Sequence, residues 1–162
     1  MREILPKEIA GAKIIFINMP LRESAQPTTT PEGPLLMATN LIQNYGIDAS
    51  IIDLNAYRLN GRYLSHDKVF QFLKDHISHG EPDVVAFSGI ITTLRWQETV
   101  AKMIRKIIPD VFLVSGNGLA TELKLGLFNY IPELDAVAHS EGDDVILKIV
   151  YDAKLIKKHG MQ

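Results

Sequence analysis

The chain has 162 residues, of which 46% are hydrophobic and 22% charged, and its formal net charge at pH 7 is −2. These values are typical of one soluble globular domain, and so small a charge gives no electrostatic reason to expect nucleic acid or an anionic membrane as a partner. The lack of cysteine excludes disulfides, thiolate metal sites, iron–sulfur clusters and cysteine nucleophiles within these residues. The first 11 residues lack a signal-peptide core and no apolar run has the length of a bilayer span, so we expect a cytoplasmic protein.

Apolar runs alternate along the chain with segments of helical periodicity, and turn residues separate them. Pro34 suits the first turn of a helix, Gly46 the end of that helix, and Ser65 the N-cap of the next one. The predicted strands are 12–18, 48–54, 83–88, 111–115 and 135–139. The predicted helices are 34–45, 65–79, 95–108, one that Thr121 caps and that ends near 128, and a last one that ends near 155.

Two of these helices carry clear apolar stripes. In the helix 95–108, Trp96 fits core packing better than a stacking platform for a ligand, and Pro109 ends the helix. The helix 34–45 is expected to bury five side chains: Leu35, Ala38, Leu41, Ile42 and Tyr45. We divide the chain into an N-terminal arm (1–11), one domain (12–156) and a tail or start of a linker (157–162).

The alternation of strand and helix predicts an α/β fold. Right-handed crossovers between buried strands give a doubly wound five-stranded parallel sheet, a flavodoxin-like (Rossmann-like) three-layer sandwich. Ligands bind such sheets outside the carboxyl ends of the strands. The loops at that edge are 18–33, 88–94, 116–121 and 139–143, and three of them carry glycine or hydroxyl residues in place of bulky side chains. Glycine after one strand is ordinary turn chemistry, but three such loops on one edge favour a large ligand lying across it.

Two motifs at this edge carry a family resemblance. Ser88-Gly89-Ile90-Ile91-Thr92 is followed by an amphipathic helix and then by Val114-Ser115-Gly116-Asn117-Gly118. This order resembles the cobalamin-binding domain family, which has a Ser-x-Leu element after its third strand and Gly-Gly after its fourth. The resemblance implies that the small residues leave a slot for the nucleotide tail of cobalamin and that Ser88 contacts its dimethylbenzimidazole. This chain has Ile90 for the leucine and Gly-Asn-Gly for the paired glycines.

The loop after the first strand indicates which branch of the family is similar. One branch has Asp-x-His-x-x-Gly there, whose histidine is the lower ligand of cobalt, whereas the loop 18–33 contains no histidine. Asn18-Met19-Pro20 and Ser140-Glu141-Gly142-Asp143 instead resemble the N-terminal cobalamin-binding domains of class B radical S-adenosylmethionine enzymes. In that branch cobalt usually lacks a histidine ligand from the protein.

The resemblance implies a non-catalytic, histidine-independent module that binds cobalamin for methyl transfer or radical chemistry in a radical S-adenosylmethionine domain, in cis or in trans. The 4Fe-4S cluster and S-adenosylmethionine would belong to that domain, since the chain has no cysteine. The implied cofactor-binding residues are Asn18, Met19, Pro20, Ser88, Gly89, Ile90, Thr92, Thr93, Gly116, Asn117, Gly118, Glu141 and Gly142.

Other interpretations remain at this stage. A flavin- or nucleotide-binding enzyme on the same fold is the alternative, although neither Gly-x-Gly-x-x-Gly nor a Walker loop follows the first strand. No Gly-x-Ser-x-Gly surrounds Ser88, so we assign no catalytic residue. His76 and His79 lack a third partner, so we assign no metal ligand. Glu141 either supports a helix N-terminus or binds a ligand amide, and His139 is either structural or an edge contact.

Overall fold

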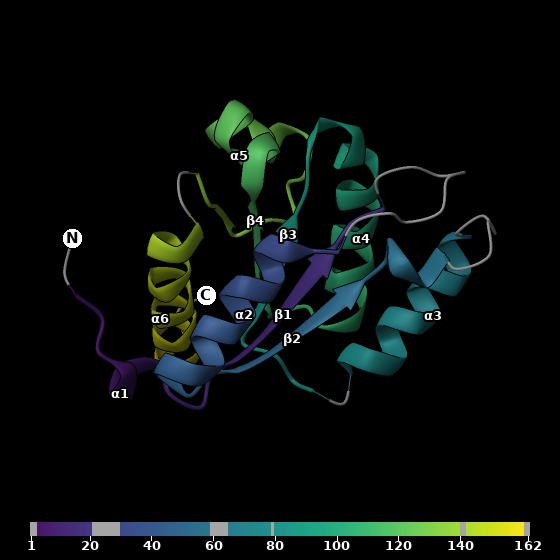
Figure 1. Cartoon of the computed structure of the whole chain (residues 1–162). Helices are drawn as coiled ribbons and strands as arrows, with labels where there is room; N and C mark the ends of the chain where they lie inside the picture. The colour runs from purple at the N-terminus through teal and green to yellow at the C-terminus, as the bar shows by residue number, and fades with distance from the viewer. Residues whose placement is uncertain (1–2, 21–29, 59–64, 79, 140–141, 161–162) are drawn as a thin grey trace.

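The structure is a computed structural model that describes residues 3–20, 30–58, 65–78, 80–139 and 142–160. It contains a five-stranded sheet in the order β2-β1-β3-β4-β5, in which every neighbouring pair is parallel (Figure 1). The strands are β1 Lys13–Asn18, β2 Asp48–Asp53, β3 Val84–Ser88, β4 Phe112–Gly116 and β5 Ala136–Val137. The predicted doubly wound α/β fold and its flavodoxin-like strand order are confirmed.

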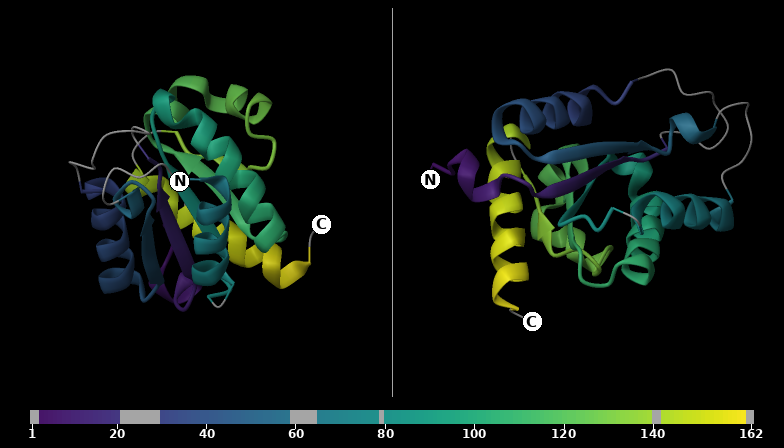
Figure 2. Two further views of the ribbon diagram at one scale, coloured as in Figure 1. Left: turned by 90° about the vertical axis from the view of Figure 1, so that its right-hand side faces the viewer. Right: turned by 90° about the horizontal axis from the view of Figure 1, so that it is seen from below.

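Helices cover both faces of this sheet. Figure 2 shows α2 and α6 on one side and α3 and α4 on the other. The α-helices are α1 Pro6–Ile9, α2 Glu32–Tyr45, α3 His66–Ile77, α4 Leu94–Ile107, α5 Asn117–Leu123 and α6 Gly142–His159. The 3₁₀ helices are η1 Ala56–Arg58, η2 Ile91–Thr93 and η3 Lys124–Asn129. Among the described residues, each helix is too short or too polar to cross a lipid bilayer.

Local capping signals predicted several boundaries correctly. The Ser65 side chain accepts a hydrogen bond from the Lys68 backbone N–H at 3.3 Å and caps α3. Gly46 ends α2 in the left-handed conformation, with φ 63°. Trp96 is 9% exposed and packs in the core, as its place on the helical stripe indicated.

Three helix predictions were wrong in detail. Thr121 is not a cap, because α5 already begins at Asn117, and the Thr121 hydroxyl donates to the Asn117 carbonyl at 3.2 Å inside the helix. The helix α6 continues past 155 to His159. Leu35 and Ile42 are 48% and 50% exposed, because the stripe of α2 that faces the sheet is narrower and consists of Pro34, Ala38 and Leu41.

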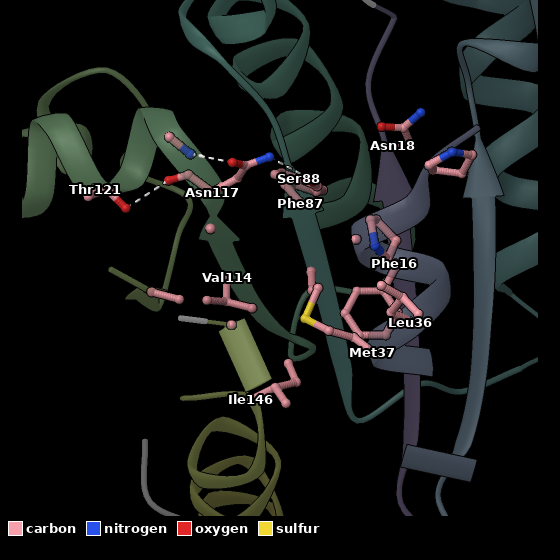
Figure 3. Close-up of a pocket in the computed structure, with 18 of the residues that line it drawn as sticks. Phe16, Asn18, Leu36, Met37, Phe87, Ser88, Val114, Asn117, Thr121 and Ile146 are labelled. Atoms are coloured by element: carbon pink, nitrogen blue, oxygen red, sulfur yellow. Dashed lines mark hydrogen bonds between the residues drawn. The ribbon is translucent and has the colours of Figure 1, made fainter. Parts of the chain in front are cut away.

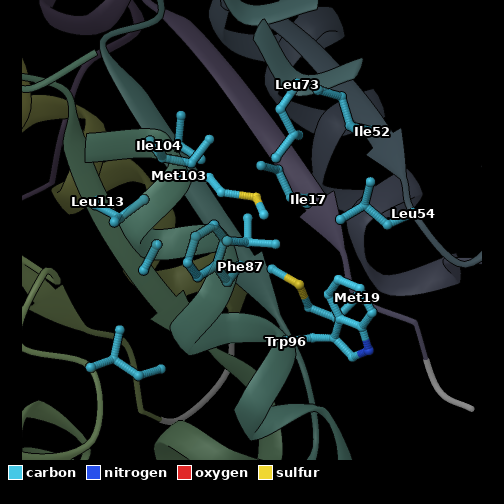
Figure 4. Close-up of a cluster of buried hydrophobic side chains, with 14 of the residues drawn as sticks. Ile17, Met19, Ile52, Leu54, Leu73, Phe87, Trp96, Met103, Ile104 and Leu113 are labelled. Carbon is cyan, nitrogen blue, oxygen red and sulfur yellow. The ribbon is translucent and has the colours of Figure 1, made fainter. Parts of the chain in front are cut away.

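The pleat of the strands separates two hydrophobic cores. The larger core lies under α3 and α4, and we call this side of the sheet the α3–α4 face. The opposite side of the sheet, covered by α2 and α6, is called the α2–α6 face. Successive side chains along each strand point alternately to the two faces. Figure 4 shows how fully large side chains fill the α3–α4 face, and the strand and β1-end residues there include Ile15, Ile17, Met19, Ile52, Val85, Phe87 and Leu113.

A buried polar chain crosses the α3–α4 face at the carboxyl end of the sheet. The Ser115 hydroxyl donates to Gln97 Oε1 at 2.7 Å, and Gln97 Nε2 donates to Thr93 Oγ1 at 3.2 Å. Thr93 in turn donates to the Ile90 carbonyl at 2.8 Å. All three side chains, Ser115, Gln97 and Thr93, are 0% exposed. This series of hydrogen bonds therefore links the end of β4 to the start of α4. Because the three side chains are buried, water cannot replace a partner that is lost.

Replacing Ser115 with alanine tests this buried chain. The substitution removes the donor to Gln97 Oε1, so we expect Ser115→Ala to lower the free energy of unfolding by about 1–3 kcal/mol. Chemical denaturation monitored by circular dichroism measures the change. Ser50→Ala is the matched control, since Ser50 is exposed on β2, and its effect should stay within about 0.5 kcal/mol. Equal effects of the two substitutions would contradict the role given to the Ser115 hydrogen bond.

Candidate functional site

A cavity of about 640 Å³ opens on the α2–α6 face at the carboxyl end of the sheet. Its floor is the sheet itself and its side walls come from α2 and α6, while α5 borders it beyond the end of β4 (Figure 3). Three of the wall residues are Met37 from α2, Ile146 from α6 and Thr121 from α5. The volume lies within the range of about 300–1,000 Å³ that small-molecule sites occupy.

Strand register builds the floor in rows. Asn18 of β1 is opposite Ser88 of β3, and Ser88 is opposite Gly116 of β4, so these three residues form the row at the mouth. Two residues earlier, on the same face, the next row consists of Phe16, Ala86 and Val114. All six residues line the cavity. The small residues Ser88 and Ala86 in the middle strand leave space that larger side chains would fill.

Hydrogen bonds hold the polar side chains of the row at the mouth. Asn18 Nδ2 donates to Asp53 Oδ1 at 2.9 Å, and the same oxygen accepts from the backbone N–H groups of Asn55 at 3.0 Å and Ala56 at 3.2 Å. These bonds link the ends of β1 and β2. At the other end of the row, Asn117 Nδ2 donates to Ser88 Oγ at 3.1 Å and links the ends of β4 and β3.

Asn117 itself has an unusual backbone. Its φ of 73° lies in the left-handed region, which asparagine and aspartate tolerate better than most residues other than glycine. Its side-chain Oδ1 accepts from the Gly118 backbone N–H at 2.6 Å. The side chain therefore folds back onto the first turn of α5 and reaches sideways to the next strand (Figure 3).

The glycines around the cavity differ in how much space adjoins them. A Cβ atom on Gly118 would meet no atom within 4 Å, and a Cβ on Gly116 would make ordinary contacts with the Ala138 Cβ at 3.7 Å. A Cβ on Gly142 would approach the Met37 sulfur at 2.9 Å, so α2 and α6 come close together at this point. Gly118 thus borders open space, Gly116 has room for a methyl group, and Gly142 adjoins the flexible end of a side chain.

The structure brings together six of the residues that the sequence singled out. Those lining the cavity are Asn18, Ser88, Gly116, Asn117, Gly118 and Gly142. Met19 is 1% exposed among the side chains of the α3–α4 face, and Thr93 is buried in the polar chain described above. Six of the residues singled out from the sequence do not line the cavity: Met19, Pro20, Gly89, Ile90, Thr92 and Thr93. Glu141 lies outside the described residues, as do Ser140, His79 and the loop residues 21–29.

Gly89 has a structural role that its motif did not reveal. A Cβ at this position would lie 2.3 Å from both Gln97 Nε2 and Thr93 Oγ1. Both atoms belong to the buried polar chain and have little freedom to move. The glycine is therefore required for close packing beneath the loop, on the side of the sheet away from the cavity.

Sequence reasoning missed much of the cavity wall. The additional lining residues are Phe16, Pro31, Glu32, Gly33, Pro34, Leu36, Met37, Ala86, Phe87, Val114, Thr121, Glu122, Ala138, Ile146 and Ile149. The period of two along each strand would have found Phe16, Ala86 and Val114, because each precedes a residue of the row at the mouth by two positions. The contributions of α2 and α6 depend on how those helices pack, which no local pattern specifies.

The described residues contain no group of three or more His, Asp or Glu side chains placed to hold a metal ion. His76 packs on the Phe72 ring at 4.0 Å on α3, and His66 lies edge-on to Trp96 at 5.5 Å. His139 is exposed beyond β5, directly after the cavity residue Ala138. The lining offers apolar contact, hydrogen bonding and the carboxylates of Glu32 and Glu122.

Comparison with known proteins gives partial similarities. No family model matches the chain. This chain is 26% identical over 88 residues to an anaerobic magnesium-protoporphyrin IX monomethyl ester cyclase of Cereibacter sphaeroides. The aligned stretch is 54% of this chain and 14% of that protein. The chain is 35% identical over 63 residues to the cobalamin-dependent radical SAM methyltransferase TokK of Streptomyces tokunonensis, which is 39% of this chain and 9% of that protein. The chain thus matches only a small part of the length of these relatives.

A solved structure with a similar outline is a GDSL-like lipase from Parabacteroides merdae. It has a TM-score of 0.43 and 9% identity, over 94% of this chain and 97% of that one. A likeness of this size supports no inference about function. The two sequence similarities are compatible with a cobalamin-related radical SAM family at low identity.

The two motif glycines at the strand ends should respond differently to alanine. Gly89→Ala places a methyl group against two immobile buried groups, so we expect it to lower the free energy of unfolding by about 1–3 kcal/mol. Gly116→Ala meets ordinary contact distances at a φ of −130°, so its effect should stay within about 0.5 kcal/mol. Urea denaturation of both variants measures the difference. Similar losses from both would contradict the distinction between a packing glycine and a cavity glycine.

Proposed function

We propose that this chain is a cobalamin-binding module, whose cavity between α2 and α6 receives the nucleotide tail of the cofactor. The observation that carries the proposal is the row Asn18–Ser88–Gly116, which sets a hydroxyl and a glycine side by side at the mouth of a cavity with an apolar floor. The partial similarity to a cobalamin-dependent radical SAM methyltransferase supports it. Ser88 and Gly116 also belong to two of the motifs that carry the sequence resemblance.

The residues present fit such a guest. The floor residues Phe16, Ala86 and Val114 are apolar and suit the faces of an aromatic base, whose burial is favourable because it removes apolar surface from water. The residues at the mouth, Asn18, Ser88 and Asn117, offer hydrogen bonds to its polar edge. A Cβ atom on Gly118 would meet no atom within 4 Å, so free space adjoins this residue. The cavity therefore combines apolar walls with a few polar groups, as cofactor sites do.

The division of labour follows from these contacts. Bound cobalamin supplies cobalt-centred methyl transfer or radical chemistry, and the protein supplies binding and orientation. The loop 18–33 contains no histidine to ligate cobalt from below, so we assign no metal ligand to this chain. We place the 4Fe-4S cluster and S-adenosylmethionine in an adjoining radical SAM domain, in cis or in trans. The module is then not catalytic alone.

Reconstitution tests the proposal directly. The purified chain is incubated with hydroxocobalamin or methylcobalamin and separated from free cofactor by gel filtration. We expect corrin absorption to co-elute with the protein at a ratio that saturates near one per chain. Protein that retains no corrin, or that purifies with bound flavin and binds no corrin, would overturn the proposal.

A bulky side chain in the cavity should block binding without unfolding the chain. A phenylalanine at Gly118 would project into open space, so we expect Gly118→Phe to weaken cobalamin binding at least about tenfold, the equivalent of about 1.4 kcal/mol. Gly126→Phe is the matched control, because a Cβ on Gly126 also meets nothing within 4 Å and the residue does not line the cavity. Fluorescence quenching of Trp96 or isothermal titration measures both affinities. Unchanged affinity in Gly118→Phe would place the tail elsewhere.

A further inference from the structure

The orientation of the Asn117 amide is fixed by its neighbour. Its two ends, oxygen and nitrogen, are distinguished only by the partners they face. A backbone N–H is always a donor, and the Gly118 N–H points at one end of the amide at 2.6 Å. That end is therefore Oδ1, and the other end, which faces Ser88, is the donor Nδ2.

This orientation determines the role of the Ser88 hydroxyl. A serine hydroxyl can donate one hydrogen bond and accept two. Ser88 Oγ accepts from Asn117 Nδ2 at 3.1 Å, and within the described part of the chain this is its one side-chain hydrogen bond. The hydroxyl proton has no acceptor among those residues. Because Ser88 lines the cavity, the proton remains for a guest that occupies it.

The backbone keeps the amide in place. Asn117 sits between the last residue of β4 and the first turn of α5, at φ 73°. Its carbonyl accepts from the Thr121 hydroxyl at 3.2 Å, so the residue is held through its backbone as well as through its side chain (Figure 3). The amide is thus presented to Ser88 from a constrained position.

We propose that Asn117 is a positioning residue that makes Ser88 a hydrogen-bond donor towards the cavity. The site then favours a guest that presents an acceptor there, such as an unprotonated ring nitrogen. A guest without an acceptor leaves the hydroxyl proton unpaired once it has displaced water, which is unfavourable in a covered site. The identity of the guest as a cobamide rests on the proposed function, but the polarity of Ser88 rests on the hydrogen bonds alone.

Substitution of Asn117 with aspartate reverses this polarity at nearly constant shape. The carboxylate still accepts from the Gly118 N–H, and aspartate also tolerates the left-handed backbone. Its second oxygen can only accept, so the Ser88 hydroxyl donates to it and turns its lone pairs to the cavity. Asn117→Gly is the second variant, because it keeps the backbone conformation and removes the amide.

Two cobamides probe the preference. Cobalamin carries dimethylbenzimidazole, which has a ring nitrogen, whereas p-cresolyl cobamide carries a phenolic ring without one. Their dissociation constants are measured by isothermal titration for the wild-type chain and each variant. Since the two guests differ in more than one respect, the readout is the change between variants in the ratio of the two dissociation constants.

We expect Asn117→Asp to shift this ratio against cobalamin by about 3- to 10-fold, the range that one neutral hydrogen bond contributes. Asn117→Gly should shift it less, in the same direction. In a Ser88→Ala background the Asn117→Asp substitution should leave the ratio unchanged, because the hydroxyl is gone. This cycle also removes the general effect of the added charge.

The outcomes separate the two proposals. If both cobamides bind and no Asn117 variant changes the ratio, the positioning role is wrong and the proposed function stands. If the shift persists in the Ser88→Ala background, it does not act through Ser88 and the positioning role is again wrong. If the wild-type chain binds neither cobamide, the proposed function fails and the assignment of this guest fails with it. If Asn117→Asp does not fold, Asn117→Gly is used instead. A shift of the ratio against cobalamin then supports the positioning role, and an unchanged ratio contradicts it.

Discussion

The candidate site depends on the combination of parallel register and strand pleat. Register sets Asn18, Ser88 and Gly116 side by side on adjacent strands. The pleat turns alternate side chains to opposite faces, so these three share a face with Phe16, Ala86 and Val114, and the side chains between them point the other way. A shift of one residue in any of these strands would exchange the cavity floor for large core side chains.

The two faces of the sheet are consequently packed to different degrees. On the α3–α4 face, Ile17, Phe87 and Leu113 meet Trp96 and the side chains of α3 and α4 in a closed core. On the α2–α6 face, the same stretch of the sheet carries Ala86 and Gly116, and α2 and α6 approach each other at Met37 and Gly142 instead of closing over it. The α2–α6 face has a buried core of its own, which includes Ile14, Leu41 and Val150, and the cavity opens at the carboxyl end of that face.

Much of the fold could be predicted because its signals are local. Buried apolar runs, the cap Ser65 and the terminator Gly46 fix the elements, and right-handed crossovers leave few strand orders to choose from. The start of α5 escaped prediction, because a residue with positive φ at Asn117 looks in sequence like a turn. The exposure of Leu35 and Ile42 was not predicted for another reason. The width of a buried stripe depends on how the helix is tilted against its sheet.

The site was harder to predict than the fold, because motif residues next to one another in sequence have different surroundings. Ser88 faces the cavity, but the adjacent Gly89 packs against Gln97 and Thr93 on the other side. Met19 follows Asn18 and likewise turns into the closed core. Treating the residues at each strand end as one continuous motif therefore combined residues of both faces. The alternation of side chains along each strand separates those that face the cavity from those that face the core.

The asparagine between the two glycines shows how a backbone constraint and a chemical role can be met by one residue. The left-handed conformation after β4 restricts the choice mainly to glycine, asparagine and aspartate. Glycine would satisfy the backbone and offer no side-chain contact, and aspartate would offer only acceptors. Asparagine alone provides an acceptor for the Gly118 N–H and a donor for the Ser88 hydroxyl at once. The residue that interrupts the paired glycines of the sequence resemblance is thus the one that joins the tips of β3 and β4 and sets the direction of the hydrogen bond between them.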